Sequence, residues 1–203
     1  MRVHRKCAIV FVFGLLTALL VAACGQGTTT EKSGATGVPL SSSSEEFVRG
    51  NELSQAGKFQ EAADEYLKAL ALDPENVDVL TNLGVAYYNL GKLDEAVEQY
   101  AKAVKLAPND GDIRSNLAAA YVQKYQANGD KDQLNQALQG YKKAVELKPD
   151  LAEAHFGLGV VYALLGQNQD AIQALETFQK LDKGKDPLAT ENAKQYLQQL
   201  RGE

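Results

Sequence analysis

The sequence has few of the residues that build reactive or metal-binding sites. Its 203 residues include two cysteines, two histidines, one methionine and no tryptophan. Cys7 and His4 lie in or just before an apolar N-terminal run, which leaves Cys24 and His155 for the rest of the chain. A disulfide framework or a cysteine-based zinc site is therefore excluded from the region after Cys24.

Positive charge is also scarce. The chain carries 21 Lys and Arg against 26 Asp and Glu. Three of the basic residues precede Cys24 and no acidic residue does, so the chain from Cys24 onward has 18 basic residues and a formal charge of −8. A protein that neutralises nucleic-acid phosphates needs the opposite balance. We therefore expect no nucleic-acid partner, and the negative charge also keeps an exported domain soluble.

The N-terminus has the pattern of an export signal. Residues 1–6 (MRVHRK) carry three fixed positive charges, and residues 8–23 carry none. This order of a basic start and an apolar run is typical of a signal peptide. As a helix the apolar run would extend about 24 Å, short of the roughly 30 Å hydrocarbon core of a bilayer. An uncleaved membrane-spanning anchor is therefore the less favoured alternative.

The apolar run ends in Val21-Ala22-Ala23-Cys24, which resembles the lipobox of bacterial lipoproteins. The resemblance implies a lipoprotein signal peptide over 1–23, cleavage before Cys24 and lipidation of Cys24 with diacylglyceryl and acyl (palmitate-type) chains. Two or three acyl chains make a lasting membrane anchor. Cleavage near Ala23 by the ordinary signal peptidase is the alternative.

Gly25 follows the predicted lipidation site, where an aspartate would favour retention in the inner membrane of enterobacterial hosts. We therefore expect a lipid-anchored cell-envelope protein on the non-cytoplasmic side. In a host with two membranes it would lie on the outer membrane and face the periplasm. In a host with one membrane it would lie on the outer face of the plasma membrane.

The segment after the anchor has a linker composition. Residues 24–44 are rich in Gly, Ser and Thr, and Val38 and Leu40 are the only sizeable apolar residues between Gly25 and Ser44. Such a segment buries too little apolar surface to offset the entropy of ordering. It is expected to be a flexible tether. As a Gly/Ser-type coil of 20 residues it would have an end-to-end distance of roughly 25 Å.

The rest of the chain repeats itself with a period of 34 residues. The same residue type recurs at that interval six times, in the pairs Gly50–Gly84, Gly57–Gly91, Ala62–Ala96, Tyr66–Tyr100, Ala69–Ala103 and Pro74–Pro108. Within one period, apolar residues recur at spacings of three and four, a glycine interrupts them, and a proline ends the unit. This pattern predicts two amphipathic helices in each unit.

These marks resemble the tetratricopeptide repeat (TPR), whose 34-residue pattern sets Leu-Gly, Tyr, Ala, Phe/Tyr, Ala and Pro at fixed places. The resemblance covers about residues 45–200 and implies an all-α fold, a TPR α-solenoid of about four helix-turn-helix repeats. The expected TPR domain spans 45–185, and an amphipathic helix in 186–203 is expected to cap it. The repeats are 43–76, 77–110, 111–151 and 152–185.

The third repeat departs from the period. Ala96 and Ala137 are 41 residues apart, so this repeat holds seven additional residues, which fall around 123–133. We expect them to lengthen the first helix of the repeat or its turn.

No motif points to catalysis, a metal or a cofactor. His155 occupies a position that prefers an aromatic residue, and a packed, hydrogen-bonded ring is expected there. The serines at 41–44 have no nearby base. Asn128-Gly129-Asp130-Lys131-Asp132 resembles a calcium loop only weakly, because no glutamate closes a twelve-residue frame. We expect neither enzyme activity nor a bound metal or cofactor.

The resemblance also implies a partner-binding groove lined by the first helix of each repeat. The residues that it places there are Phe47, Asn51, Asn82, Val85, Tyr88, Asn89, Asn116, Phe156 and Val160. Asparagines both donate and accept hydrogen bonds, which suits the backbone of a bound segment. Solvated polar residues on helix faces are the alternative.

Some TPR domains clamp the acidic tail of heat-shock chaperones with two asparagines and three basic residues. Here Asn51 and Asn82 match, but Phe47, Asp112 and Asn116 replace the basic residues. A partner segment that is apolar or basic is therefore expected instead.

The sequence favours a membrane-anchored scaffold or adaptor that binds a protein or peptide segment at the cell envelope. Lipid-anchored TPR proteins of this make include pilotins of pilus assembly and secretion, and adaptors in outer-membrane or cell-wall assembly. A protein or enzyme acting on cell-wall fragments is one alternative. A self-assembling structural module is the other, because the ends of solenoids can stack.

Overall fold

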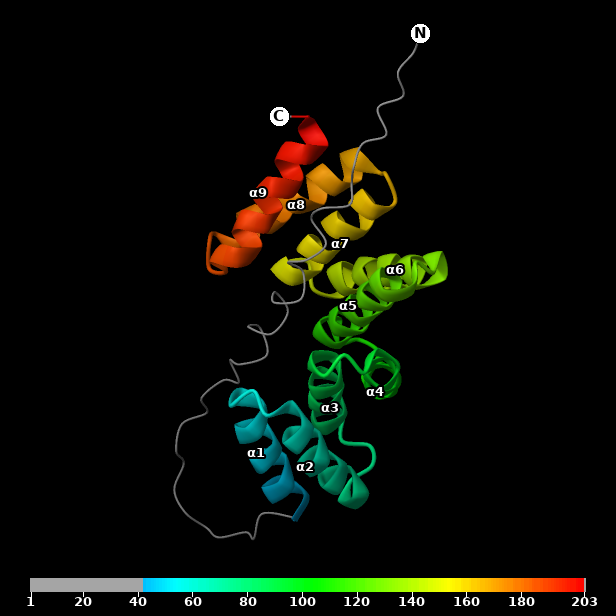
Figure 1. Ribbon diagram of the computed structural model, residues 1–203, viewed down its shortest axis with the longest axis vertical. Coiled ribbons are helices and arrows are strands. Elements are labelled where there is room, and N and C mark those ends of the chain that lie inside the picture. Colours follow the sequence, from blue (N-terminus) through cyan, green and yellow to red (C-terminus); the bar gives the residue numbers. More distant parts are fainter. Residues whose placement is uncertain (1–41, 203) are drawn as a thin grey trace. The chain divides into compact units, whose positions relative to one another are not determined.

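The computed structural model describes residues 42–202 (Figure 1). The predicted signal peptide, Cys24 and the tether to residue 41 lie outside this part. Residues 42–202 form nine α-helices and no strand, which confirms the all-α prediction. The helices are α1 (Ser42–Gln55), α2 (Phe59–Leu72), α3 (Val77–Asn89), α4 (Leu93–Leu106), α5 (Gly111–Asn128), α6 (Lys131–Leu147), α7 (Ala152–Leu164), α8 (Asn168–Asp182) and α9 (Pro187–Arg201).

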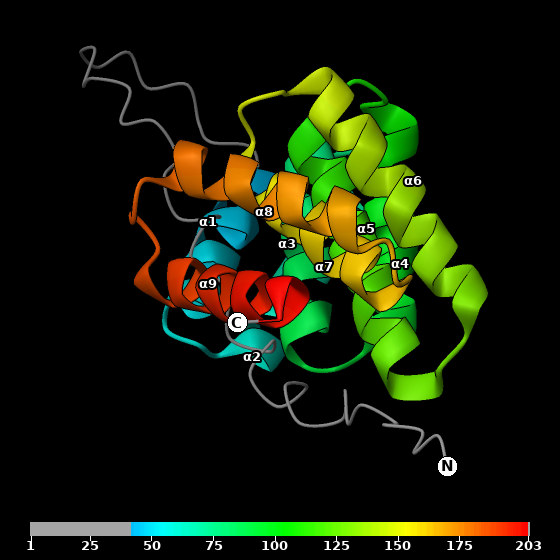
Figure 2. The same cartoon turned by 90° about the horizontal axis from the view of Figure 1, so that it is seen from above.

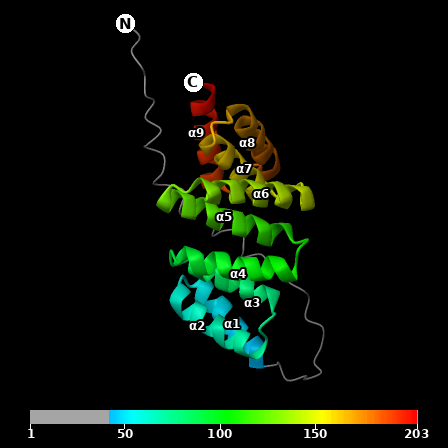
Figure 3. The same ribbon diagram turned by 90° about the vertical axis from the view of Figure 1, so that its right-hand side faces the viewer.

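The helices form hairpins that follow one another along the chain (Figure 3). The pairs are α1 with α2, α3 with α4, α5 with α6 and α7 with α8, and the second helix of each pair contacts the first helix of the next. The first helices also contact one another in order, from α1 through α3 and α5 to α7. One layer of the solenoid is therefore built from first helices and the other from second helices.

Glycines make the tight turns inside the hairpins. Gly57 and Gly91 have φ of 74° and 72°, a left-handed conformation that glycine adopts without steric cost. The next residue in each turn closes the first helix, with Lys58 N donating to Leu53 O and Lys92 N donating to Tyr87 O, each at 2.9 Å. This is the usual way of satisfying the last carbonyls of a helix. The period of these glycines in the sequence thus marks the turns.

A second set of glycines lets the paired helices approach closely. A Cβ atom on Gly84 would lie 2.7 Å from Tyr100 Cε1, and one on Gly50 would lie 2.5 Å from Tyr66 Cε1. Only a residue without a side chain leaves room for the tyrosine ring of the second helix. The Gly–Tyr pairs at period 34 therefore record a repeated helix contact.

Each repeat also buries its first helix against the repeat before it. Leu83 and Val79 of α3 belong to the same buried cluster as Ala62, Tyr66 and other residues of α2. An amphipathic helix pair does not bury all its apolar surface alone, so neighbouring repeats complete the core of each other.

The additional residues of the third repeat lengthen both of its helices. We expected the first helix or its turn to be longer. The first helix is longer and so is the second: α5 has 18 residues and α6 has 17, compared with 13 in α3 and 14 in α4. The turn stays short, because Gly129 ends α5 with φ of 72° and the Asp130 side chain caps α6 by accepting from Asp132 N. Lys124 on the lengthened α5 pairs with Asp94 of α4 at 2.5 Å.

The last helix, α9, packs on α8 and α7 (Figure 2). The buried Asp182 organises the connection between α8 and α9. Its Oδ2 accepts from Gly184 N at 3.0 Å and from Thr190 Oγ1 at 2.8 Å, and its Oδ1 accepts from Asp186 N at 3.2 Å. Asp186 then caps α9 by accepting from Leu188 N and Ala189 N.

No helix in residues 42–202 is both long enough and apolar enough to cross a bilayer.

Candidate partner-binding face

The predicted groove residues all lie on the layer of first helices. Phe47 and Asn51 come from α1, Asn82 to Asn89 from α3, Asn116 from α5, and Phe156 and Val160 from α7. We call the surface of α1, α3, α5 and α7 that carries these residues the first-helix face.

At its N-terminal end the face holds a hydrogen-bonded network of three side chains. The Oδ1 atom of Asn51 accepts from Tyr66 Oη and from Asn82 Nδ2, each at 2.8 Å. The network joins α1, α2 and α3, so these two asparagines also tie the first two repeats together. Phe47 lies beside it and packs on Tyr66, with ring centroids 6.1 Å apart.

The middle of the face is apolar with amide groups around it. Val85 and Tyr88 are partly exposed and pack on a buried cluster that includes Tyr100 and Ala120. Asn89 donates from Nδ2 to Val85 O at 2.8 Å, which holds its side chain along α3. Asn116 of α5 is partly exposed, and its amide has no partner within residues 42–202. Val85, Tyr88 and Asn116 therefore offer both apolar surface and hydrogen bonds.

Two tyrosine hydroxyls, one on α2 and one on α3, have contrasting surroundings. Burial raises the pKa of Tyr66 to about 12, and its polar neighbours oppose this shift. Burial also raises the pKa of Tyr88 to about 12, with Gln123 nearby opposing the shift. Among the described residues, no hydrogen bond of good geometry reaches the buried Tyr88 hydroxyl. Tyr141 of α6, which is fully buried, has a pKa raised in the same direction by burial and by Tyr88.

The C-terminal end of the face is closed, in contrast to its predicted role. Phe156 is 9% exposed and Val160 is 2% exposed, so neither is an accessible anchor for a partner. The Phe156 ring packs edge-on against Phe178 of α8, with centroids 5.2 Å apart. Phe178 stands where the earlier repeats have Ala69, Ala103 and Ala144, and its large ring covers a position that an alanine would leave open.

The start of the first helices forms a charged rim. Asp78, Asp112 and Glu153 lie in the first turns of α3, α5 and α7. Lys148 Nζ donates to both carboxylate oxygens of Asp112, each at 3.0 Å. This hydrogen bond raises the pKa of Lys148, and the charges of Asp112, Asp150 and Glu153 act in the same direction.

Sequence reasoning missed two residues that hold side chains of this face in place. The Tyr66 hydroxyl was not expected to hold Asn51, because the tyrosine belongs to a second helix. Lys148 was not expected to neutralise Asp112, although its place at the end of α6 puts it next to the start of α5, the first helix of the same repeat. In both cases the position of the residue within the repeat could have indicated its contact with the first helix.

The other candidate residues have structural surroundings. The ring of His155 is hydrogen-bonded, with Nε2 donating to Pro149 O at 2.9 Å. The Asn128–Asp132 stretch is the α5–α6 turn described above. Within residues 42–202, no three His, Cys, Asp or Glu side chains are grouped so that they could hold a metal ion.

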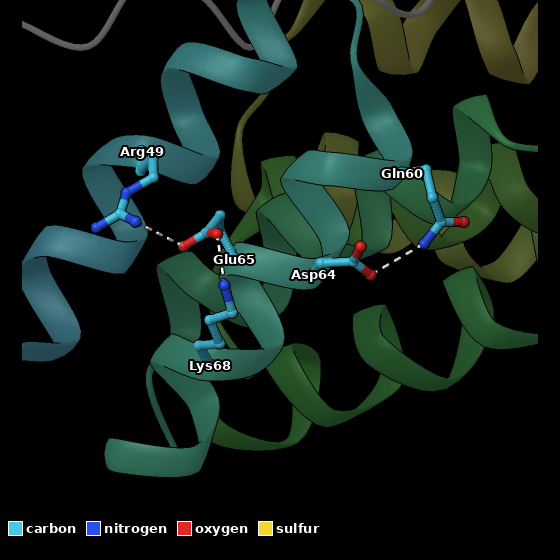
Figure 4. A network of polar contacts seen from close by, with 5 residues as sticks. All are labelled: Arg49, Gln60, Asp64, Glu65 and Lys68. Carbon is cyan, nitrogen blue, oxygen red and sulfur yellow. Dashed lines mark hydrogen bonds and ion pairs between the residues drawn. The ribbon is translucent and has the colours of Figure 1, made fainter.

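A charged cluster links α1 and α2 in the first repeat (Figure 4). Arg49 of α1 points towards Glu65 of α2, with Nη1 and Oε2 3.7 Å apart, and Lys68 pairs with the same carboxylate at 2.7 Å. Arg49 stands 34 residues before the fully buried Leu83. A polar residue where later repeats bury a leucine is typical of a terminal repeat.

Stacked helix hairpins with one layer of first helices define an α-solenoid built from helix-turn-helix repeats. Models of the tetratricopeptide repeat match residues 47–111 and 153–183, and a TPR repeat model matches residues 130–166. The chain belongs to the tetratricopeptide-repeat family. The stretch between 111 and 130, which no model matches, coincides with most of the lengthened α5. A comparison with curated proteins gives no match.

Solved TPR structures resemble the chain over most of its length. The TPR protein TTC0263 of Thermus thermophilus is 27% identical with a TM-score of 0.66, and the match covers 78% of this chain and 81% of that one. The MamA protein is 25% identical with a TM-score of 0.62, covering 79% and 86%. The first TPR of Spaghetti (RPAP3), bound to the HSP90 peptide SRMEEVD, is 28% identical with a TM-score of 0.56, covering 61% and 93%.

Proposed function

We propose that the chain is a lipid-anchored adaptor of the bacterial cell envelope that binds a segment of another protein on its first-helix face and catalyses no reaction. The observation that carries the binding function is the partly exposed apolar and amide surface at Val85, Tyr88 and Asn116. A related TPR domain that was solved with a bound peptide supports the same class of function.

The anchor is the part of the proposal that rests on Val21-Ala22-Ala23-Cys24 alone. It is tested by fractionating cells and measuring the mass of the N-terminal peptide of the purified protein. Lipidation predicts a peptide that starts at Cys24 and carries acyl chains, and a C24S variant that leaves the membrane fraction. An N-terminal peptide without added mass would contradict the anchor and leave the binding function standing.

The binding function is tested by photo-cross-linking in cells from the first-helix face. Suitable positions are Gln55, exposed at the end of α1, and Asn116 of α5. A matched control is Gln139, which is exposed on the second helix α6. We expect a specific cross-linked protein from Gln55 and Asn116 that is absent from Gln139. Equal products from all three positions, or none from the first two, would overturn the proposed face.

The alternatives make different predictions. Release of products from purified peptidoglycan would favour an enzyme of the cell wall. Growth of the scattering mass with concentration would favour a self-assembling module, which the charged surface around Arg49 and Glu65 disfavours. A pilotin role predicts that deleting the gene impairs secretin assembly and pilus number.

A further inference from the structure

The open part of the first-helix face is centred on α3 and on Asn116 of α5. At α7 the two central positions, Phe156 and Val160, are buried. On α5 the equivalent positions, Ser115 and Ala119, are buried as well, whereas Val85 and Tyr88 of α3 and Asn116 of α5 are partly exposed. A bound segment therefore has its apolar contacts at α3 and its neighbours rather than along the whole solenoid.

Acidic residues lie in the first turns of α3, α5 and α7. Asp78 is exposed, Glu153 is partly exposed and the Asp112 side chain is 54% exposed, and all three lie at the starts of first helices. Acidic residues also stabilise a helix when they lie in its first turn, so their presence has a local cause. Their field still acts on whatever binds next to them.

Within residues 42–202, Lys148 is the only cation that forms an ion pair with one of these three carboxylates. It is held by Asp112, while Asp150 and Glu153 lie near enough to raise its pKa further. None of the predicted face residues is Lys or Arg. The rim beside the open surface therefore keeps an excess of negative charge.

We propose that the occupant of the first-helix face is a cationic segment with apolar side chains, whose Lys or Arg residues lie over Asp78 and Glu153 and whose apolar side chains lie on Val85 and Tyr88. This inference rests on the proposed function. Exposed ion pairs add little affinity each, so the carboxylates select the partner and steer its approach, while the apolar contacts provide most of the binding energy.

The proposal is tested by selecting a displayed library of random peptides on the immobilised full chain. We expect the enriched peptides to combine Lys or Arg with apolar residues. Enrichment of acidic or uncharged peptides would overturn the proposal, and so would the absence of any enrichment.

The position of the charges is tested with the double variant D78N/E153Q. Its matched control is D170N/E61Q, which removes two acidic residues from the first turns of the second helices α8 and α2. An enriched peptide is expected to bind the first variant about five-fold more weakly, with a reduced dependence on salt, and to bind the control normally. An equal loss in both variants would mean that only net charge matters, which contradicts the proposal.

Hydrogen exchange with the same peptide locates the occupied helices. Protection is expected in α3, in α5 and in the first turn of α7 around Glu153, and protection confined to second helices would overturn the proposed position. The cross-linking experiment tests the cationic occupant and the binding function separately. A partner that cross-links from Asn116 through an acidic segment would refute the cationic occupant alone, whereas the absence of any partner would refute the binding function.

Discussion

The hydroxyl of Tyr66 donates a 2.8 Å hydrogen bond to Asn51 Oδ1, and this bond connects a second helix to the first-helix face. Asn82 donates to the same oxygen from the next repeat. The asparagines that suit a partner backbone therefore also stabilise the junction between repeats one and two. Their substitution would change both stability and binding, so tests of binding should avoid them.

Replacing Tyr66 or Tyr88 by phenylalanine should separate a paired hydroxyl from an unpaired one. Tyr66→Phe loses the bond to Asn51 and is expected to lower the free energy of unfolding by roughly 1 kcal/mol. Tyr88→Phe removes a buried hydroxyl without a good partner among the described residues and is expected to be neutral or stabilising. Urea denaturation of the two variants checks this. A larger loss for Tyr88→Phe would contradict the assignment.

Gly157→Ala is expected to destabilise the chain by about 1–3 kcal/mol, the usual cost of overpacking a core. A Cβ at this position would lie 2.2 Å from Tyr141 Cζ, and Tyr141 is buried. An alanine in a helix interior normally stabilises it relative to glycine by about 1 kcal/mol. The sign of the change in the thermal midpoint therefore shows whether overpacking or helix propensity dominates. A raised midpoint would refute the close contact between Gly157 and Tyr141.

The chain is expected to lose stability in alkaline solution. The pKa of Tyr66 and of Tyr88 is about 12 in the folded state, against the ordinary tyrosine value of 10.0. A raised folded-state pKa means that the stability is fully present below pH ~10 and falls as the pH rises from about 10 towards 12. Circular dichroism melts across this range should show a falling midpoint. The Tyr66→Phe/Tyr88→Phe variant should show a shallower fall.

Asp182→Ala is expected to release α9. The carboxylate accepts three hydrogen bonds from the connection and from Thr190, and their loss should cost roughly 2 kcal/mol. Hydrogen exchange should become faster in residues 187–201 before it changes elsewhere. Asp186→Ala, which removes only the cap of α9, provides a milder comparison at about 1 kcal/mol. Uniformly faster exchange in all helices would argue against a local role.

Arg49→Leu should promote self-association of the solenoid. The substitution places a leucine next to Val48, which is already 49% exposed, and leaves Glu65 with Lys68 as its remaining cation. An enlarged apolar patch at a solenoid end is expected to attract another copy. Light scattering over a range of concentrations measures the effect. Arg49→Lys serves as the control and should stay at the mass of the unmodified protein.

The repeat fold was readable from the sequence because each periodic residue marks a repeated contact. Gly84 and Tyr100 recur because a ring packs on a backbone, and Gly91 recurs because a turn requires a left-handed residue. The division of the additional residues between α5 and α6 was not readable, since the added residues continue either helix equally well.

The candidate site could be predicted from the sequence only in part. The repeat pattern gives the helix face on which a residue lies, but it does not give the exposure of the side chain. Val85 and Tyr88 lie on the first-helix face with partly exposed side chains, whereas Phe156 and Val160 are buried. At Phe156 the added cover is the ring of Phe178, which stands where the earlier repeats have alanine. One large side chain in a neighbouring helix was enough to remove an expected anchor.

The longer helices of the third repeat make it different from its neighbours and so fix the order in which the repeats pack. Equal repeats allow one unit to take the place of another during folding, a known route to misassembly in repeat proteins. Lys124 on the lengthened α5 reaches back to Asp94, and Tyr141 on the lengthened α6 fits against Gly157 in the following repeat. A chain displaced by one unit would lose both fits, so the insertion penalises swapped or slipped arrangements.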